Sequence, residues 1–526
     1  MKSDQLFSLV NKNRSVVYLS VILFYLTTLF STYPNKAGFI TDEMAFLNVC
    51  DGYDNYIDFQ KDFSNKMHMV ARPVSAVVHG FSYWTFRDHF MYYHILNLLI
   101  FSLGTIVFYF LCRNLFNHSF AFLATVISIS YPLASATTFS SIIVNANVAC
   151  LLCMLSLNIA AKKEPDKISL LACFLMILSL LSYEAFFAYI PLFLFIRIIK
   201  NDNKISKDIL RYFVIEVFLI LIPIVFYRKF LQFKIFTNKL DKLQRLQVRT
   251  MFERAVYSIY YNIKSHTIDF WQLISNAFAK NGPYLFVLTL ICVVIVLLVF
   301  VYGNKANDYK KSFSFKKILI LFVFIVLCFL AYQLVYISSW NYYPNIHGYE
   351  SRILVNYRYL YGLLLTGLFF LLVYKFNKIQ NVLLPVIAVI LFINTYCVFA
   401  QKEAFSGAYS YSEYHIKKIS EIIKQDGLYT KDSLSIVAYM PAQFPEQVNK
   451  EEILTYSWDF SPPIQKQFKS VKIFAWSADP ERLLFTKSGI SVPVFSASNF
   501  PFYLYNYKTQ NISFVSNKEE FLKAVE

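Results

Sequence analysis

The sequence predicts an all-α polytopic membrane protein that carries a small C-terminal soluble α/β domain. Three observations support this fold class. The 526 residues are 57% hydrophobic and only 16% charged, whereas a soluble protein carries about 25% charged residues. Apolar runs close to the ~20 residues that cross a bilayer recur up to residue 400. Beyond residue 403 these runs stop, and short alternating apolar stretches replace them.

Eleven apolar segments are candidate membrane spans, because each approaches the length that the hydrocarbon core requires. They cover residues 15–33, 91–111, 119–137, 139–160, 168–183, 185–199, 209–227, 283–302, 317–336, 357–374 and 381–400. We therefore expect a membrane module of about 11 transmembrane helices in residues 1–403. Its outer loops would be residues 34–90, 228–282 and 338–356.

The positions of lysine and arginine predict the orientation of the chain. Short basic patches share one side when eleven crossings are counted, at residues 113, 162–167, 200–207, 305–317 and 375–378. This side is the cytoplasm, because short cytoplasmic loops carry an excess of Lys and Arg. The first apolar segment has no small-residue cleavage site after it, so we expect an uncleaved signal anchor with a cytoplasmic N-terminus. We expect a bacterial inner-membrane protein with a periplasmic C-terminal domain.

The apolar run from residue 168 to residue 199 decides the number of crossings. It is longer than an ordinary span, and both of its flanks are basic. Two short helices that meet at Tyr183 and Glu184 explain both facts, whereas one tilted helix explains only the length. This hairpin places Glu184 towards the outer side.

One predicted outer loop, residues 228–282, conflicts with the charge rule because it is rich in Lys and Arg. Lys242, Arg245 and Arg249 follow the i, i+3, i+7 spacing of one helix face. A basic amphipathic helix on the membrane surface explains this pattern. Such a helix would either attract an anionic lipid or simply lie at the interface.

Several other functional classes are disfavoured. The formal net charge of +17 does not indicate nucleic-acid binding, because no soluble basic domain carries it. The eight cysteines lie mostly in apolar runs, where a thiol packs as a small hydrophobe, so we expect no disulfide framework. No Walker, Gly-x-Ser-x-Gly or His-Glu-x-x-His motif occurs, which argues against an ATP-driven pump. We expect no metal and no cofactor.

Residues 404–526 predict a soluble accessory domain outside the bilayer. Short apolar stretches suggest strands at Leu434–Met440, Val471–Trp476 and Ile490–Phe495. Residues 412–424 carry isoleucines at helical spacing, and Gly427 is expected to end this helix. The domain has no nucleotide-binding glycine loop, so we expect the chemistry in the membrane module.

The first outer loop contains two adjacent carboxylates, Asp42 and Glu43, soon after the first apolar segment. A carboxylate this close to the membrane can deprotonate an acceptor hydroxyl, and its neighbour can raise its pKa by like-charge repulsion. The alternative is that an Asp caps a short surface helix that begins at Thr41. We favour Asp42 or Glu43 as a general base. The later aspartates of the loop follow helical spacing, which is typical of a solvated face: Asp51, Asp54, Asp58 and Asp62.

Two charged residues at the ends of apolar segments are further candidates. Arg72 precedes Pro73, which suits a first helical turn, and would bind a phosphate or pair with a loop acid. Glu184 lies in an apolar run, where a carboxylate is costly and indicates a functional site. Together with Tyr183 it would orient an acceptor, pair with Arg72 or Arg352, or hold the apex of the hairpin.

The last outer loop holds His347, Glu350 and Arg352, and Arg358 follows it. Arginine binds phosphate oxygens in a two-pronged way. Arg352 and Arg358 are therefore candidates for binding a donor phosphate, with Glu350 and His347 in support. The alternative is an ion pair between Glu350 and Arg352.

Four short patches resemble the GT-C superfamily of membrane glycosyltransferases, and within it the bacterial and phage serotype-converting O-antigen glucosyltransferases. They are Thr41-Asp42-Glu43, Ala71-Arg72-Pro73, Ser182-Tyr183-Glu184, and Glu350-Ser351-Arg352 with Arg358-Tyr359. The resemblance implies an inverting transfer at an outward-facing site, from a polyprenyl-phosphate sugar to a lipid-linked or surface glycan. The family often has Asp-Asp in place of Asp42-Glu43, which leaves open which carboxylate is the base, and Gly-Arg-Pro in place of Ala71-Arg72-Pro73.

Two other functions are weighed against this expectation. An O-antigen polymerase is also polytopic, but it does not require carboxylates directly after the first helix, and the soluble domain fits it poorly. A transporter or flippase for polyprenyl-linked glycans would carry charged residues inside several helices and internal repeats. The apolar segments here are almost uncharged apart from Glu184 and Glu216.

Overall fold

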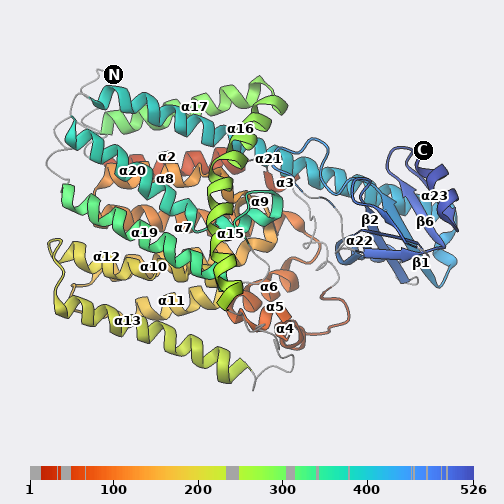
Figure 1. Cartoon of the computed structure of the whole chain (residues 1–526), viewed down its shortest axis with the longest axis horizontal. Helices are drawn as coiled ribbons and strands as arrows, with labels where there is room; N and C mark the ends of the chain where they lie inside the picture. The colour runs from red at the N-terminus through yellow and green to blue at the C-terminus, as the bar shows by residue number, and fades with distance from the viewer. Residues whose placement is uncertain are drawn as a thin grey trace.

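The computed structural model of the chain is a block of roughly parallel helices from which a small sheet domain projects at one end (Figure 1). It describes residues 13–31, 33–36, 49–65, 67–232, 248–303, 314–338, 343–376, 379–451, 453, 457–468, 472–486, 489–492 and 496–526. The polytopic membrane class predicted from composition is confirmed by apolar helices long enough to cross a bilayer.

The long helices of the membrane module coincide with the apolar segments of the sequence. They are α2 (Arg14–Phe30), α7 (Phe90–Leu115), α8 (His118–Ile129), α10 (Val144–Lys162), α11 (Leu170–Ser182), α12 (Pro191–Lys200), α13 (Lys207–Phe226), α17 (Pro283–Gly303), α19 (Phe315–Ser338), α20 (Tyr357–Lys375) and α21 (Gln380–Gln425). Shorter helices on the side of the sheet domain are α3 (Tyr33–Lys36), α4 (Tyr56–Ser64), α5 (Met67–Val70) and α6 (Pro73–Phe86) (Figure 1).

The expected number of about 11 transmembrane helices is too high for the described residues. Seven helices there are long and apolar enough to span, or eight if the pair α8 and residues 132–139, bent by 49°, counts as one. Helix α2 has 17 residues, α11 has 13 and α12 has 10. These are shorter than the ~20 residues that cross the hydrocarbon core.

The run from residue 168 to residue 199 forms the expected hairpin. Lys200 Nζ, at the end of α12, donates to the carbonyl oxygens of Ala161 (2.9 Å) and Lys163 (2.8 Å). Arg197 Nη2 donates to Lys167 O at 3.0 Å, just before α11. Both ends of the run therefore lie together, and its apex is the short helix η4 (Glu184–Tyr189). Each arm is too short to cross alone.

A break in the helical backbone lies between α8 and α10. It contains η2 (Pro132–Ala134), α9 (Ser135–Phe139) and η3 (Ser141–Ile143), all almost fully buried. Backbone groups freed by a break cannot find water in a bilayer, so side chains must satisfy them. Asn147 Nδ2 donates to Thr137 O at 2.6 Å, Asn97 Nδ2 donates to Ser140 O at 3.1 Å, and Tyr409 Oη donates to Phe139 O at 2.9 Å.

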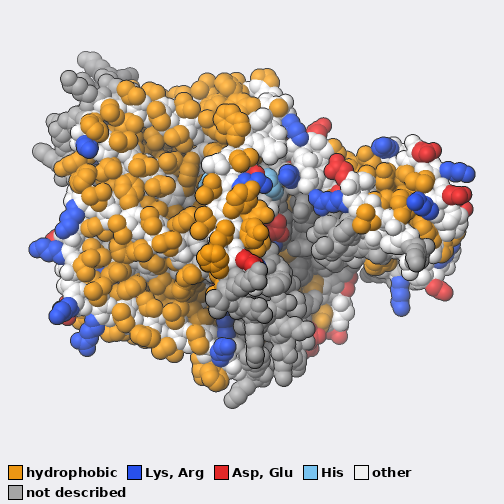
Figure 2. All heavy atoms as spheres, viewed as in Figure 1, with side chains coloured by type: hydrophobic (Ala, Val, Ile, Leu, Met, Phe, Trp, Pro, Cys, Tyr) orange, Lys and Arg blue, Asp and Glu red, His pale blue; other side chains and the backbone are white. Residues whose placement is uncertain are grey.

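A broad apolar surface covers the face of the membrane module that Figure 2 shows. Side chains of α17 and α19 expose leucine, valine and phenylalanine, and orange atoms cover this face in Figure 2. Helix α13 is the least covered span, with only 17% of its most apolar window buried. Lys and Arg atoms line the end opposite the sheet domain (Figure 2). This distribution is what a lipid-facing belt with one basic rim produces.

Helix α15 (Val248–His266) lies across the spans, near one end of them (Figure 1). Its polar face is turned inward: Arg254 Nη2 donates to Tyr336 O at 3.1 Å, and Asn262 Nδ2 donates to Gln333 Oε1 at 3.0 Å. Its outward face is apolar and includes Phe252, which is 72% exposed. Lys242 and Arg245 of the expected basic helix lie outside the described residues, and so does the Arg249 side chain.

Helix α21 joins the two parts of the molecule without a break. It has 46 residues, so at 1.5 Å per residue it is about 69 Å long, more than twice the ~30 Å hydrocarbon core. The expected boundary at residues 403 and 404 falls inside this helix rather than in a linker. Gly427 ends it as expected, with a φ of 64° that favours glycine.

The C-terminal domain is the expected α/β fold. Its main sheet has the order β2-β1-β6-β7, where β1 pairs parallel with β2 and β6, and β7 is antiparallel to β6. The strands are β1 (Ser433–Tyr439), β2 (Lys472–Ala478), β6 (Phe502–Asn506) and β7 (Asn511–Val515). A smaller antiparallel sheet contains β3 (Leu484–Phe485), β4 (Gly489–Val492) and β5 (Ser496–Asn499).

The two faces of the main sheet bury separate cores. Ile436 of β1 shares one core with Ile419 of α21 and with α22 (Ser457–Gln465). Val437 shares the other with Phe521 of α23 (Lys518–Val525). Successive residues of a strand point to opposite faces, so this alternation fixes the register.

We predict that Gly362→Ala destabilises the membrane module by about 1–3 kcal/mol, because overpacking forces neighbours to shift. A Cβ at Gly362 of α20 would clash with Ser128 and with the Ala124 carbonyl of α8. Thermal stability in detergent, followed by size-exclusion chromatography, measures the effect. Gly282→Ala is the matched control, since its Cβ meets nothing within 4 Å. Equal stability of the two variants would contradict the close α8–α20 contact.

Candidate functional site

An ion pair joins two residues that the sequence singles out, at the end of the module from which the sheet domain projects. Arg72 Nε lies 2.8 Å from Glu184 Oε2, and Arg72 Nη2 lies 2.7 Å from Glu184 Oε1. The Arg72 guanidinium also lies over the Tyr183 ring, 4.9 Å from its centroid. This two-pronged geometry is the strong form of an arginine–carboxylate pair. The predicted pairing of Glu184 with Arg72 is confirmed.

Local sequence explains why these side chains meet. Pro73 occupies the first turn of α6, so Arg72 is the residue before the helix. Glu184 is the first residue of η4, directly after the end of α11 at Ser182. Helix α6 packs against α11, so the start of one helix lies beside the end of the other. The hairpin apex thereby faces the first outer loop.

The pair is charged over the whole physiological pH range. Removal from water raises the pKa of Glu184, but the Arg72 guanidinium more than offsets this and lowers that pKa to about 2. His79 of α6 is buried, and burial together with the charge of Arg72 lowers its pKa to about 4. His79 is therefore neutral at pH 7 and adds no charge beside the Arg72–Glu184 pair.

Asp42 and Glu43 lie outside the described residues, so their role as general base stays a prediction. The described chain on either side is packed at the outer end. Before the loop, Tyr33 donates a hydrogen bond to the Phe139 carbonyl. After it, Cys50 belongs to the apolar cluster that includes Phe59 of α4 and Tyr83 of α6.

Arg358 is placed differently from the prediction. It is 2% exposed, and its Nη2 donates to Ala134 O (2.9 Å), Thr137 Oγ1 (2.9 Å) and Thr138 Oγ1 (2.7 Å). The guanidinium also stacks 4.6 Å from the Phe101 centroid. Arg358 therefore holds the helix break in the structure, and its role in binding a donor phosphate stays a prediction.

Arg352 forms the predicted alternative, an ion pair with Glu350 at 3.2 Å between Nη2 and Oε1. Both residues belong to η6 (Gly348–Leu354), just before α20. Ser351 lies between these two residues. Its hydroxyl donates to Gly348 O at 2.8 Å and accepts from the Ala136 amide at 2.9 Å. The turn around Arg352 is thus fixed to the helix break.

His347 contacts Asn449 of the C-terminal domain rather than the Arg72–Glu184 pair. Its Nδ1 lies 3.3 Å from Asn449 Oδ1, and its Nε2 lies 4.0 Å from Asp269 Oδ2. Burial and the charge of Lys450 lower the pKa of His347. The neighbouring Gly348 amide donates to Asn449 O at 2.7 Å. His347, placed in a supporting role by the sequence, contributes to an interface between the outer loop and residues 449–451.

Sequence reasoning missed the carboxylate that organises this interface. Glu451 is fully buried, and its oxygens accept from the Val448 amide (2.8 Å) and the Asn449 amide (3.1 Å). The residues it organises also contact α16 (Ile268–Lys280), since Asn276 Nδ2 donates to Val448 O at 3.1 Å. Short polar turn residues gave no signal, because such turns are common in solvated loops.

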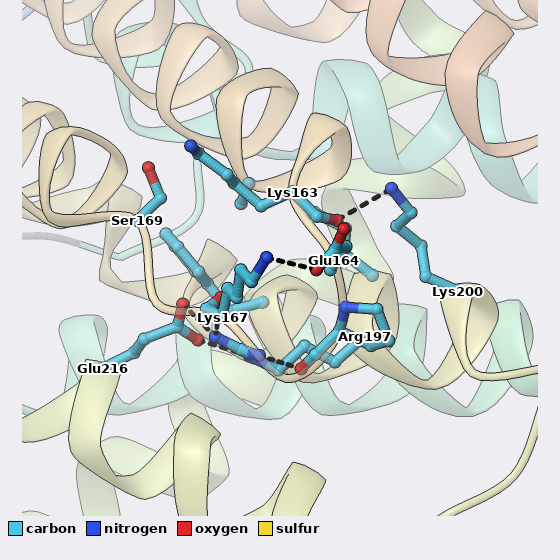
Figure 3. A pocket seen from close by; sticks show the side chains of 11 residues that line it. Lys163, Glu164, Lys167, Ser169, Arg197, Lys200 and Glu216 are labelled. Atoms are coloured by element: carbon cyan, nitrogen blue, oxygen red, sulfur yellow. Dashed lines mark hydrogen bonds and ion pairs between the residues drawn. The ribbon is translucent and has the colours of Figure 1, made fainter.

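A second charged cluster lies at the opposite, basic end of the module (Figure 3). Arg197 Nε lies 2.9 Å from Glu216 Oε2, and Arg197 Nη2 lies 2.6 Å from Glu216 Oε1. Arg197 also donates to the Pro165 and Lys167 carbonyls. These groups join α12, α13 and the turn before α11. Glu216 was noted in the sequence as a charge within a span. Its charge is balanced by the ion pair with Arg197, which joins α12 to α13.

In the described part of the chain, no three His, Cys, Asp or Glu side chains gather into a group that could hold a metal. A search of protein-family models finds no match to this chain, and no curated protein matches it.

We predict that Arg72 and Glu184 stabilise the fold jointly, with a coupling energy of about 1 kcal/mol. Their side chains are 27% and 40% exposed, so solvent screening keeps this value moderate. Unfolding of Arg72→Met, Glu184→Gln and the double variant in SDS titrations measures the coupling. The matched control is the pair Lys167–Glu164, which is 63% and 65% exposed and should couple near zero. Equal coupling in both cycles would refute a special role for the first pair.

We predict that Glu451→Ala releases the contact between the C-terminal domain and the outer loop. Loss of a buried acceptor costs about 1–3 kcal/mol, which raises the exchange rate of the Gly348 amide about tenfold or more. Hydrogen–deuterium exchange by mass spectrometry measures this change. Glu446→Ala, at an exposed position in the same segment, is the control and should leave the exchange unchanged. Protection of Gly348 that survives Glu451→Ala would show that the carboxylate does not hold the contact.

Proposed function

We propose that the chain is an inverting glycosyltransferase of the bacterial inner membrane. It transfers a sugar, with glucose as the first candidate, from polyprenyl phosphate to a cell-surface glycan such as O-antigen on the periplasmic face. The observation that carries this proposal is the Arg72–Glu184 pair. A fixed pair of opposite charges at the outer end of a lipid-exposed module is costly to build, and such sites are usually functional.

The position of the pair supports a substrate that comes from the membrane. The start of α6 and the apex of the α11–α12 hairpin hold it at the end of the module opposite the basic rim. By the positive-inside rule this end is the outer one. The C-terminal domain projects from the same end (Figure 1). Lipid-linked donor and surface glycan would therefore meet where the two parts of the protein adjoin.

The proposed reaction needs a base and a stabilised leaving group. Asp42 or Glu43 would accept the proton of the acceptor hydroxyl, whose oxygen attacks the anomeric carbon from the face opposite the phosphate. The bond between that carbon and the phosphate oxygen breaks, and the electron pair leaves with polyprenyl phosphate. Arg72 would add positive potential for the leaving group. Glu184 would fix the Arg72 guanidinium as a positioning residue.

We predict that Asp42→Asn or Glu43→Gln lowers sugar transfer by about 100-fold or more, since a general base contributes roughly 10²–10⁴-fold. The measurement is transfer of labelled sugar from polyprenyl-phosphate-glucose to surface glycan in membranes. Asp54→Asn, at an exposed aspartate of the same outer loop, is the control and should transfer at the wild-type rate.

All variants must insert at equal levels for this comparison. If Asp42→Asn and Glu43→Gln both retain the full activity of an active wild type, the first loop does not supply the base. If wild-type membranes extend glycan chains but transfer no single sugar, the O-antigen polymerase alternative replaces the proposal. Movement of the lipid-linked glycan across the bilayer without transfer would instead support the transporter or flippase.

A further inference from the structure

The three arginines expected to bind the donor phosphate are already engaged by protein groups. Glu184 neutralises Arg72, Glu350 pairs with Arg352, and the helix break surrounds Arg358. A phosphate that binds beside the Arg72–Glu184 pair therefore needs a further cation. This cation must lie near Glu184, be exposed, and be reachable from the lipid.

Arg228 meets these conditions. It lies in the last turn η5 (Tyr227–Leu231), which continues α13 at the outer end, and it is exposed. The preceding residue fixes this turn close to Arg72 in the chain, because Tyr227 Oη donates to Val70 O at 2.7 Å, two residues before Arg72. The charge of Arg228 is also close enough to act on the Glu184 carboxyl. In the ranges that the structure covers, no hydrogen bond or ion pair engages its guanidinium.

The helix that carries Arg228 provides the route for a lipid. Helix α13 is the least buried of the seven spans, with 17% of its window covered. Phe218, Ile222 and Val225 are exposed along it, and Phe226 and Phe230 flank Arg228 in the chain. An isoprenoid chain lying along these side chains would bring its phosphate to the last turn of α13. A water-soluble phosphate compound has no apolar chain to bury against these exposed side chains of α13.

We propose that Arg228 binds the phosphate of a polyprenyl-phosphate lipid whose chain lies along α13. The inference rests on the proposed function for the identity of the lipid, and it adds the residue that holds the phosphate and the route of entry. Arginine suits this role because its planar guanidinium donates two parallel hydrogen bonds to phosphate oxygens.

The test measures lipid binding separately from sugar transfer. Purified full-length protein in phosphatidylcholine nanodiscs is incubated with a photoreactive polyprenyl phosphate, and crosslinking is quantified. Arg228→Gln should lower crosslinking about tenfold, the loss typical of a hydrogen-bonded charge contact of ~1.4 kcal/mol. Arg211→Gln is the matched control, because Arg211 is an exposed arginine at the other end of the same helix. It should crosslink like the wild type, and Arg228→Lys should retain part of the signal.

Each outcome bears on the proposal. Wild-type crosslinking by Arg228→Gln overturns it, as does an equal loss in Arg211→Gln. Displacement of the probe by an equimolar amount of phosphatidylglycerol overturns the assignment to a polyprenyl lipid in favour of phospholipid headgroups. If Arg228→Gln loses crosslinking while the wild type transfers no sugar, the lipid site stands and the proposed function fails. If sugar transfer depends on Asp42 or Glu43 but Arg228→Gln crosslinks like the wild type, the proposed function stands and this inference fails.

Discussion

A broken helix in the centre of the membrane module is the constraint on which the other elements depend. Between Ser130 and Val144 the backbone leaves its helix where almost no residue is exposed. Its carbonyl groups must find donors inside the protein, because lipid provides none. The donors come from across the chain: Tyr33, Asn97, Asn147, Arg358 and Tyr409. Satisfying one break thus ties α3, α7, α10, α20 and α21 together.

The same constraint places the outer loops. Ser351 bonds to the Ala136 amide and so fixes η6 to the break, while Tyr409 fixes the long helix α21 to the carbonyl of Phe139. The C-terminal domain follows α21 and is held by contacts from His347 and Gly348. The Arg72–Glu184 ion pair lies at this same end of the module. Its location depends on the hairpin apex, which the buried core of the module holds.

Much of the fold follows from local pattern. Apolar length identified the spans, and the position of Gly427 correctly predicted where α21 ends. Basic residues on both flanks identified the hairpin between residues 168 and 199. The number of spans was overestimated because composition alone does not reveal where a buried segment stops being helical. The expected boundary at residues 403 and 404 lies inside one continuous helix, which the change in composition does not reveal.

The site was only partly predictable. A lone carboxylate in an apolar run is costly wherever it lies, so Glu184 and Glu216 stood out from sequence alone. Arg72 was one of the two partners considered for Glu184, although it lies 112 residues away along the chain, whereas Arg197 was not recognised as the partner of Glu216. Arginines look alike in a sequence, yet Arg358 is a backbone donor in the core and Arg228 is an exposed charge in the turn that follows α13.

The sequence by itself determined the membrane class, the apolar segments, the basic rim and the C-terminal α/β domain, because these depend on composition and short-range spacing. Tertiary structure decided which charges form ion pairs, which arginines are bonded to other groups of the protein, and which helix exposes most of its apolar surface. Those outcomes depend on contacts between residues far apart in the chain. Such contacts are favoured because most buried polar groups need a hydrogen-bond partner, and no short stretch of sequence contains that information.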